Sequence, residues 1–140
     1  MERRLTVYTD GAARGNPGPS ASGFMVYEGG KLLHRHSEYN GKSTNNHSEY
    51  RAVALALKWC VANLDAEELH VSLYSDNELV VRQLNGRYKM KSESLRPLNE
   101  EIRETSRKFG KIEFRNVRRE NIYIAAVDRS LNELLDRMED

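Results

Sequence analysis

The alternation of hydrophobic and polar positions predicts three consecutive strands, after which helices and strands alternate. The strand segments carry β-branched and aromatic residues, whereas the helical segments repeat their apolar residues every three or four positions. The predicted strands cover residues 5–9, 23–28, 31–39, 69–74 and 111–117. The predicted helices begin near Asn46, directly after Ser75-Asp76-Asn77, near Leu95 and near Val127. The resulting order, β-β-β-α-β-α-α-β-α, is typical of an α/β fold with a mixed sheet flanked by helices.

Two polar segments are expected to form loops. Residues 12–20 and 40–45 are rich in Gly, Asn, Ser and Pro, which favour turns. Gly29-Gly30 is short enough to make a tight hairpin between the second and third strands. The first strand is accordingly expected to end at Asp10-Gly11.

Length and composition narrow the class of protein. A chain of 140 residues fits one domain, spanning residues 1–140. The 22 basic and 21 acidic side chains give a net charge of +1, so overall charge alone indicates no nucleic-acid partner. Cys60 is the only cysteine, which excludes an intrachain disulfide and a cysteine-based zinc site. The sequence contains neither an apolar run of the ~20 residues that a membrane helix needs nor the shorter one of a signal peptide. We therefore expect a cytoplasmic protein without a membrane segment.

Four carboxylates fall at the predicted ends of strands and helices. Asp10 ends the first strand and Asp76 follows the fourth, and ligands of α/β sheets bind beyond the carboxyl ends of neighbouring strands. Glu49 shares the apolar stripe of the first helix, and Asp128 opens the last helix on its packed side. Carboxylates held close together repel each other unless a cation lies between them. Hard oxygen ligands suit Mg²⁺ or Mn²⁺, and two such ions can flank a phosphodiester.

Each acid also has an ordinary structural interpretation. Asp10 can belong to a turn, Glu49 can pair with Asn46 in a capping box, and Asp76 can cap a helix. Asp128 can simply favour the positive end of a helix dipole. The residue pattern alone leaves both interpretations open.

Five short blocks of sequence, in the same order along the chain, resemble the type 1 ribonuclease H family. The blocks are Tyr8-Thr9-Asp10-Gly11-Ala12, Gly15-Asn16-Pro17-Gly18-Pro19, Thr44-Asn45-Asn46-His47-Ser48-Glu49-Tyr50, Ser75-Asp76-Asn77-Glu78-Leu79-Val80 and Val127-Asp128-Arg129. The resemblance implies a five-stranded mixed sheet of order 3-2-1-4-5. It also implies an endonuclease that cuts the RNA strand of an RNA·DNA hybrid and leaves 5′-phosphate and 3′-hydroxyl ends. Asp10, Glu49, Asp76 and Asp128 would then be the catalytic acids that bind the metal, with two ions per site.

The chain departs from the family pattern in three places. Val127 stands before Asp128 where the family usually has Ala, and the preceding segment is longer by a residue or two. Many members carry a histidine in that segment, and this chain has none there. Either Arg118, Arg119 or Asn121 replaces it, or the step that the histidine serves is absent. Asn77-Glu78 replaces the common Ser-Gln, and an ionised glutamate cannot donate a hydrogen bond to nucleic acid.

A hybrid-cutting enzyme must recognise the 2′-hydroxyl, which both donates and accepts hydrogen bonds. The candidate substrate-binding residues, all amide, hydroxyl or glycine positions near the predicted site, are Gly11, Asn16, Thr44, Asn45, Asn46 and Asn77. Helix capping is an equally simple role for Asn45 and Asn46. Basic residues in segments 79–96 and 107–119, with Tyr88 among them, suit a phosphate backbone.

The expected partner is thus an RNA·DNA hybrid, and the protein is expected to be a monomer. Two other functions remain open at this point: a hybrid-binding domain without activity, and a nuclease of the same superfamily that acts on DNA.

Overall fold

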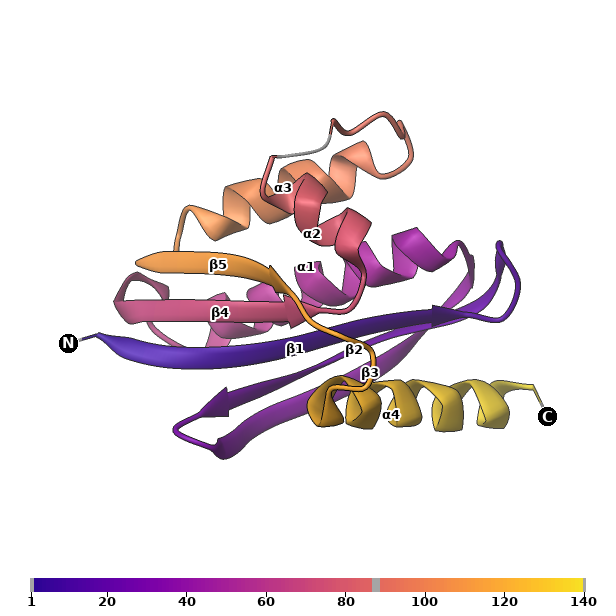
Figure 1. Cartoon of the computed structure of the whole chain (residues 1–140), viewed down its shortest axis with the longest axis horizontal. Helices are drawn as coiled ribbons and strands as arrows, with labels where there is room; N and C mark the ends of the chain where they lie inside the picture. The colour runs from indigo at the N-terminus through magenta and orange to yellow at the C-terminus, as the bar shows by residue number, and fades with distance from the viewer. Residues whose placement is uncertain (1, 87–88, 140) are drawn as a thin grey trace.

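The computed structural model describes residues 2–86 and 89–139, and its centre is a five-stranded sheet (Figure 1). The strands are β1 (Arg3–Ala13), β2 (Gly18–Glu28), β3 (Lys31–Ser43), β4 (Leu69–Ser75) and β5 (Lys111–Asn116). The α-helices are α1 (Asn45–Asn63), α2 (Glu78–Leu84), α3 (Arg96–Ser106) and α4 (Ile122–Met138), and a short 3₁₀ helix covers Ala66–Glu68. The strand order is β3-β2-β1-β4-β5, with β1, β2 and β3 antiparallel and β1, β4 and β5 parallel. The predicted mixed sheet of order 3-2-1-4-5 is confirmed.

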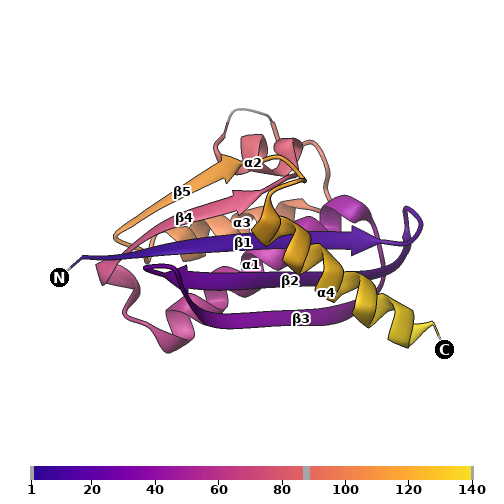
Figure 2. The same ribbon diagram turned by 60° about the horizontal axis from the view of Figure 1, so that its bottom comes forward.

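Helices cover both faces of the sheet. α1 packs against β1 and β2 on one face and supports α3, whereas α4 crosses β1, β2 and β3 on the other (Figure 2). Side chains of β1 alternate between these faces: Leu5 and Val7 join the larger core beneath α1, and Tyr8 and Ala12 join the smaller core beneath α4. Asp10 falls in the register of Tyr8 and Ala12, so it lies on the α4 face.

α1 has the apolar stripe expected from its sequence. Val53, Ala56 and Cys60 are all buried, and Glu49 lies on the same stripe. Thr44 caps the helix, because its hydroxyl oxygen accepts a hydrogen bond from the backbone N–H of His47 at 3.1 Å. No helix in the described part of the chain is long and apolar enough to cross a membrane.

Two predicted loops are largely strand, and this corrects the sequence interpretation. β1 and β2 remain paired through Gly11↔Ser22 and Ala13↔Ser20, so the expected loop 12–20 shrinks to residues 14–17. β3 continues to Ser43, which leaves only Thr44 before α1 in place of the loop 40–45. The physical reason is tertiary: pairing with a neighbouring strand outweighs the turn preference of small polar residues.

The last helix also begins earlier than predicted. The side-chain oxygen of Asn121 accepts hydrogen bonds from the backbone N–H groups of Tyr123 and Ile124, at 2.9 and 3.1 Å. α4 therefore begins at Ile122 instead of near Val127. The sequence does not reveal this early start, because Ile122 and Tyr123 are apolar residues that are exposed in the first turn. They obscure the amphipathic pattern of the helix there.

Candidate metal centre and active-site cleft

Asp10 and Asp76 meet where β1 and β4 stop pairing. The parallel register ends at Tyr8↔Tyr74, and the Thr9 hydroxyl donates a 3.4 Å hydrogen bond to the Tyr74 carbonyl just beyond it. Asp10 and Asp76 each follow the last paired residue by two positions. The expected convergence is confirmed, although Asp10 lies within β1 and not at its end.

Glu49 reaches the same point because β1 and α1 are in very close contact. A Cβ atom on Gly11 would lie only 2.4 Å from the carbonyl carbon of Ser48 and 2.5 Å from the backbone nitrogen of Glu49. Glycine is thus required by the space available. The Ser22 hydroxyl donates a 2.6 Å hydrogen bond to the Ser48 carbonyl and fixes this turn of α1 on the sheet. Polar groups of Gly11 and Ser75 beside the Glu49 carboxylate act to lower its pKa.

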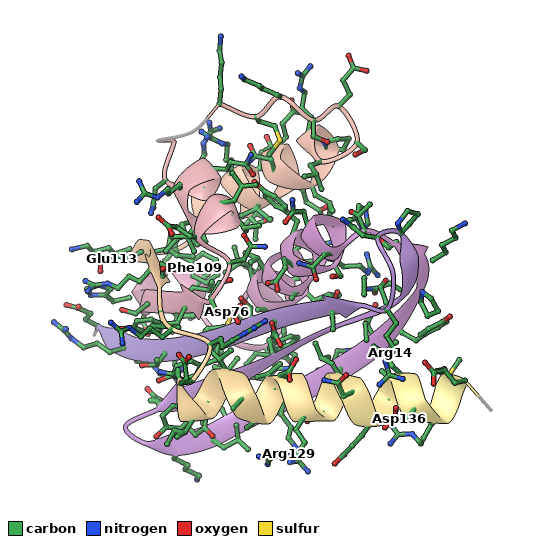
Figure 3. All side chains as sticks on the ribbon, turned by 45° about the vertical axis from the view of Figure 1, so that its right-hand side comes forward. Arg14, Asp76, Phe109, Glu113, Arg129 and Asp136 are labelled. Atoms are coloured by element: carbon green, nitrogen blue, oxygen red, sulfur yellow. The ribbon has the colours of Figure 1, made fainter. Side chains whose placement is uncertain are left out.

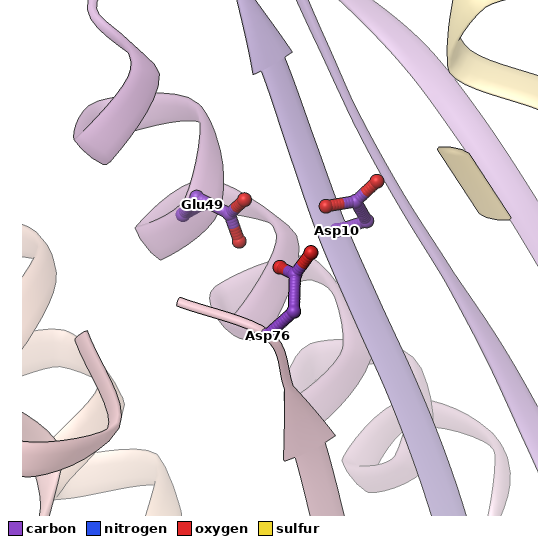
Figure 4. A group of neighbouring side chains, drawn as sticks. All are labelled: Asp10, Glu49 and Asp76. Carbon is purple, nitrogen blue, oxygen red and sulfur yellow. The ribbon is translucent and has the colours of Figure 1, made fainter. Parts of the chain in front are cut away.

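The three carboxylates form one compact cluster, shown in Figure 4. Asp10, Glu49 and Asp76 each offer an oxygen within 4.8 Å of the other two. Asp10 and Glu49 are each only 4% exposed. The Glu49 Oε2 atom is buried and has no hydrogen-bond partner among the described residues. A buried carboxylate oxygen without a donor is costly, and a divalent cation bound there would satisfy it.

The electrostatics of the cluster favour a cation in the same way. Burial, followed by the charges of Glu49 and Asp76, raises the pKa of Asp10 well above its ordinary value. Burial and the charge of Asp76 likewise raise the pKa of Glu49, against the lowering effect of its hydrogen bonds. Burial raises the pKa of Asp76, which the positive charge of Arg119 partly offsets. The cluster therefore retains protons unless a cation replaces them. An all-oxygen site of this kind fits Mg²⁺ or Mn²⁺.

Asp128 differs from the other three acids, and its position on the last helix differs from the predicted one. It occupies the second turn of α4 and is exposed, so it neither opens the helix nor lies on the packed stripe. It still lines the same cleft, and its charge contributes to the raised pKa of Asp10 and of Asp76. Asp128 therefore lies at the rim of the cluster, outside the group of three that converge.

The simpler structural interpretations of the four acids are wrong. Asp10 lies in a paired strand, not in a turn. Thr44 caps α1, which excludes the capping box of Asn46 and Glu49. Asn77, not Asp76, caps α2, through a 3.1 Å hydrogen bond from the Val80 N–H. Asp128 lies beyond the first turn of α4, where the effect of the helix dipole has faded.

The cluster opens into a cleft of about 1030 Å³. Of the residues predicted to bind substrate, Gly11, Asn45 and Asn77 line this cleft. The other three, Asn16, Thr44 and Asn46, do not line it.

Asn16 and Asn46 lie outside the cleft wall, and each accepts a hydrogen bond from a residue of the wall. The Asn16 side-chain oxygen accepts a 3.0 Å hydrogen bond from the Asn45 backbone N–H. The Asn46 oxygen accepts one from the Asn77 amide at 3.1 Å. These oxygen atoms are therefore already engaged within the protein.

The far wall of the cleft comes from the segment between β5 and α4. Arg118 and Arg119, both candidate replacements for the missing histidine, line it, whereas Asn121 does not. Asn116 and Glu120 also line it and were not singled out from the sequence. Nothing in the sequence pattern marked them, because they reach the cleft only through the pairing of β5 with β4.

The predicted basic surface is only partly described. Lys89 and Lys91 are exposed between α2 and α3, and Arg96 is exposed at the start of α3. Arg87 and Tyr88, which belonged to the same prediction, lie outside the described residues.

Comparison with known proteins agrees with this arrangement. Residues 8–127 match a family described as reverse transcriptase-like. The chain is 33% identical over 136 residues to the bifunctional protein Rv2228c of Mycobacterium tuberculosis, covering 95% of this chain and 36% of that protein. It is 36% identical over 94 residues to ribonuclease HI of Halobacterium salinarum, covering 66% of this chain and 46% of that protein. The chain thus spans between a third and a half of the length of these two relatives.

Solved structures give closer agreement over the whole domain. LC11-RNase H1, crystallised with an RNA/DNA hybrid, superposes with a TM-score of 0.89 at 33% identity, covering 97% of this chain and 99% of that one. RNase H1 of Halobacterium salinarum superposes with a TM-score of 0.86 at 32% identity, covering 96% and 98% of the two chains. The matching family, the shared fold and the acidic cluster together show that the chain belongs to the type 1 ribonuclease H family.

Proposed function

We propose that the protein is an endonuclease that hydrolyses the RNA strand of RNA·DNA hybrids and leaves 5′-phosphate and 3′-hydroxyl ends. The observation that carries this proposal is the cluster of Asp10, Glu49 and Asp76, with its unpartnered buried oxygen, at the base of an open cleft. Support for the substrate comes from LC11-RNase H1, a 33% identical protein whose structure contains an RNA/DNA hybrid.

The same cluster supports two divalent ions, Mg²⁺ or Mn²⁺, as cofactors. Asp10, Glu49 and Asp76 would hold them, and Asp128 at the rim would complete the set of ligands. Ions bound there lower the pKa of an attacking water and stabilise the leaving oxygen of the phosphodiester. The protein's own contribution is to hold these carboxylates close together in a site that folding has already desolvated, where bound ions would replace their protons.

Residues on the cleft wall suit recognition of the two strands. Asn45 presents an amide group that can both donate to and accept from a ribose 2′-hydroxyl. The Asn77 amide is bonded to Asn46 and to the Val80 N–H, which leaves one N–H and one oxygen lone pair for such a contact. Arg118 and Arg119 place positive charge on the opposite wall, where a phosphate is attracted. Arg119 also attracts Asp76, so its charge interacts with the acidic cluster.

A cleavage assay on matched substrates tests the proposal. One sequence is prepared as an RNA·DNA hybrid, duplex RNA and duplex DNA, each with one labelled strand, and incubated with purified protein and Mg²⁺ or Mn²⁺. We expect cleavage of the RNA strand of the hybrid alone, and products that a phosphate-dependent 5′-exonuclease degrades. Binding without cleavage under both metals would instead indicate a hybrid-binding domain, and cleavage of duplex DNA would indicate another nuclease. The monomeric state and the cytoplasmic location stay predictions.

A further inference from the structure

A chain of hydrogen bonds connects the turn after β1 to the carboxylate of Asp128. Asn132 follows Asp128 by one turn of α4, and its amide nitrogen donates to the Asp128 carbonyl at 3.0 Å and to the Asp128 Oδ2 atom at 3.2 Å. Arg14 reaches α4 from the β1–β2 turn, and its Nη2 donates to the Asn132 Oδ1 and carbonyl oxygens at 3.3 and 3.2 Å. Arg14 therefore contacts the other end of the same side-chain amide.

This pairing fixes which way the Asn132 amide points. An asparagine amide has an acceptor end and a donor end. The guanidinium of Arg14 has only donors, so it selects the oxygen of Asn132 and leaves the nitrogen facing Asp128. The Asp128 carbonyl and carboxylate are both acceptors, so they favour the same orientation, and Arg14 adds a hydrogen bond that holds the Asn132 side chain in place from the other end.

Arg14 is itself held on both sides. Its guanidinium also forms a 2.7 Å ion pair with Asp136 in the next turn of α4 (Figure 3). A second ion pair, also at 2.7 Å, joins it to Glu139, which caps the end of the helix. Its backbone N–H donates a 2.8 Å hydrogen bond to the Pro19 carbonyl across the turn. A Cβ atom on Gly18 would lie 2.1 Å from the Arg14 carbonyl oxygen, so this turn is closely packed. The contacts of Arg14 thus hold one end of the hydrogen-bond chain in place.

The position of Asp128 makes such a device useful. Asp10 and Glu49 are fixed by their burial and Asp76 directly follows β4, whereas Asp128 is exposed at the rim. We infer that Arg14 and Asn132 are positioning residues that orient the Asp128 carboxylate toward the cleft, so that it completes the metal site. This inference rests on the proposed function of the cluster.

Substitutions at Asn132 separate positioning from ordinary stability. Asn132→Asp keeps an oxygen for Arg14 and adds charge attraction to it, but it replaces the donor that faces Asp128 with a second carboxylate oxygen. A purely structural role would survive this change, whereas positioning of Asp128 would not. Arg3→Ala is the matched control, because Arg3 makes a similar two-bond pair with Glu28, at 2.8 and 2.9 Å, at the opposite end of β1.

The experiment measures Mn²⁺ binding to the free protein by calorimetry, together with kcat, KM and the Mg²⁺ dependence of hybrid cleavage. We expect Asn132→Asp and Arg14→Ala to weaken Mn²⁺ binding at least fivefold and to lower kcat about tenfold, with KM for the hybrid within twofold of wild type. Arg3→Ala should match wild type in all of these. In an Asp128→Asn background the Asn132 and Arg14 substitutions should have no further effect on Mn²⁺ binding, because their route to the site is gone.

Two results would overturn the inference: wild-type Mn²⁺ binding and kcat in Asn132→Asp, or an undiminished effect of that substitution when Asp128 is already Asn. If the proposed function is wrong, the wild-type protein will not cleave the hybrid, which is a different result from either of these. The Mn²⁺ titrations need no substrate and decide the positioning role in that case too.

Discussion

Replacing Gly11 with alanine should uncouple the two elements that bring Asp10 and Glu49 together. The new Cβ would lie 2.4 Å from the Ser48 carbonyl carbon, whereas ordinary contacts begin at 3.4 Å. The backbones of β1 and α1 must therefore separate by about 1 Å, since both neighbours are main-chain atoms that cannot rotate away. Such overpacking typically costs about 1–3 kcal/mol. For a domain of this size that lowers Tm by about 4–12 °C.

The effect on activity should be larger than the effect on stability. The oxygens of the acidic cluster lie within 4.8 Å of one another, so a shift of about 1 Å is a large fraction of their spacing. Misplacement of about 1 Å can cost on the order of 100-fold in rate. We expect kcat for hybrid cleavage to fall by about that factor while circular dichroism shows a folded protein.

Gly30→Ala is the control for lost stability alone. Gly30 has a φ of +79°, and a Cβ atom there would meet nothing within 4 Å. The backbone strain costs roughly 1–2 kcal/mol, but it lies in the hairpin between β2 and β3. Its kcat should equal that of wild type. A Gly11→Ala protein with wild-type kcat, or a Gly30→Ala protein that loses as much activity, would refute the argument that close contact at Gly11 sets the site.

Further predictions concern the acids, their protons and the last helix. Asp76→Asn should lower kcat by orders of magnitude with a Tm close to that of wild type, and near-normal cleavage would remove Asp76 from the metal site. Folding raises the pKa values of Asp10 and Glu49, so the stability that they contribute is present below their ordinary pKa values of 3.8 and 4.5 and is lost as pH rises. The Tm of the metal-free protein should therefore fall between about pH 5 and pH 8. Added Mg²⁺ should restore the Tm, and the Asp10→Asn substitution should make the fall smaller. A Tm that does not change with pH would contradict the raised pKa values. Binding of Mg²⁺ at neutral pH should release protons, which calorimetry in buffers of different ionisation enthalpy would detect. Asn121→Ala removes the cap of α4 and should lower the free energy of unfolding, measured with denaturant, by about 0.5–2 kcal/mol. An unchanged free energy of unfolding would show that the cap is unimportant.

Local patterns in the sequence were enough to predict the order of the elements and to place Asp10, Glu49 and Asp76 where they converge, whereas the metal-binding role of the acids came from the family resemblance. Periodicity is a local property, so the stripe of Glu49 on α1 and the strand before Asp76 were visible without a fold. The resemblance added the sheet order, which periodicity cannot give because it depends on pairing between distant segments.

The ends of the strands and the position of Asp128 depend on contacts between distant segments. Residues 12–20 and 40–45 have the composition of loops, but most of them are strand because neighbouring strands offer hydrogen-bond partners. The position of Asp128 depends on the cap at Asn121 and on Arg14, which lies 118 residues before the Asn132 that it contacts. A local pattern specifies which face a side chain takes within its own element. Only packing between elements specifies what that side chain meets, because contact distances are set by atoms far away in the chain.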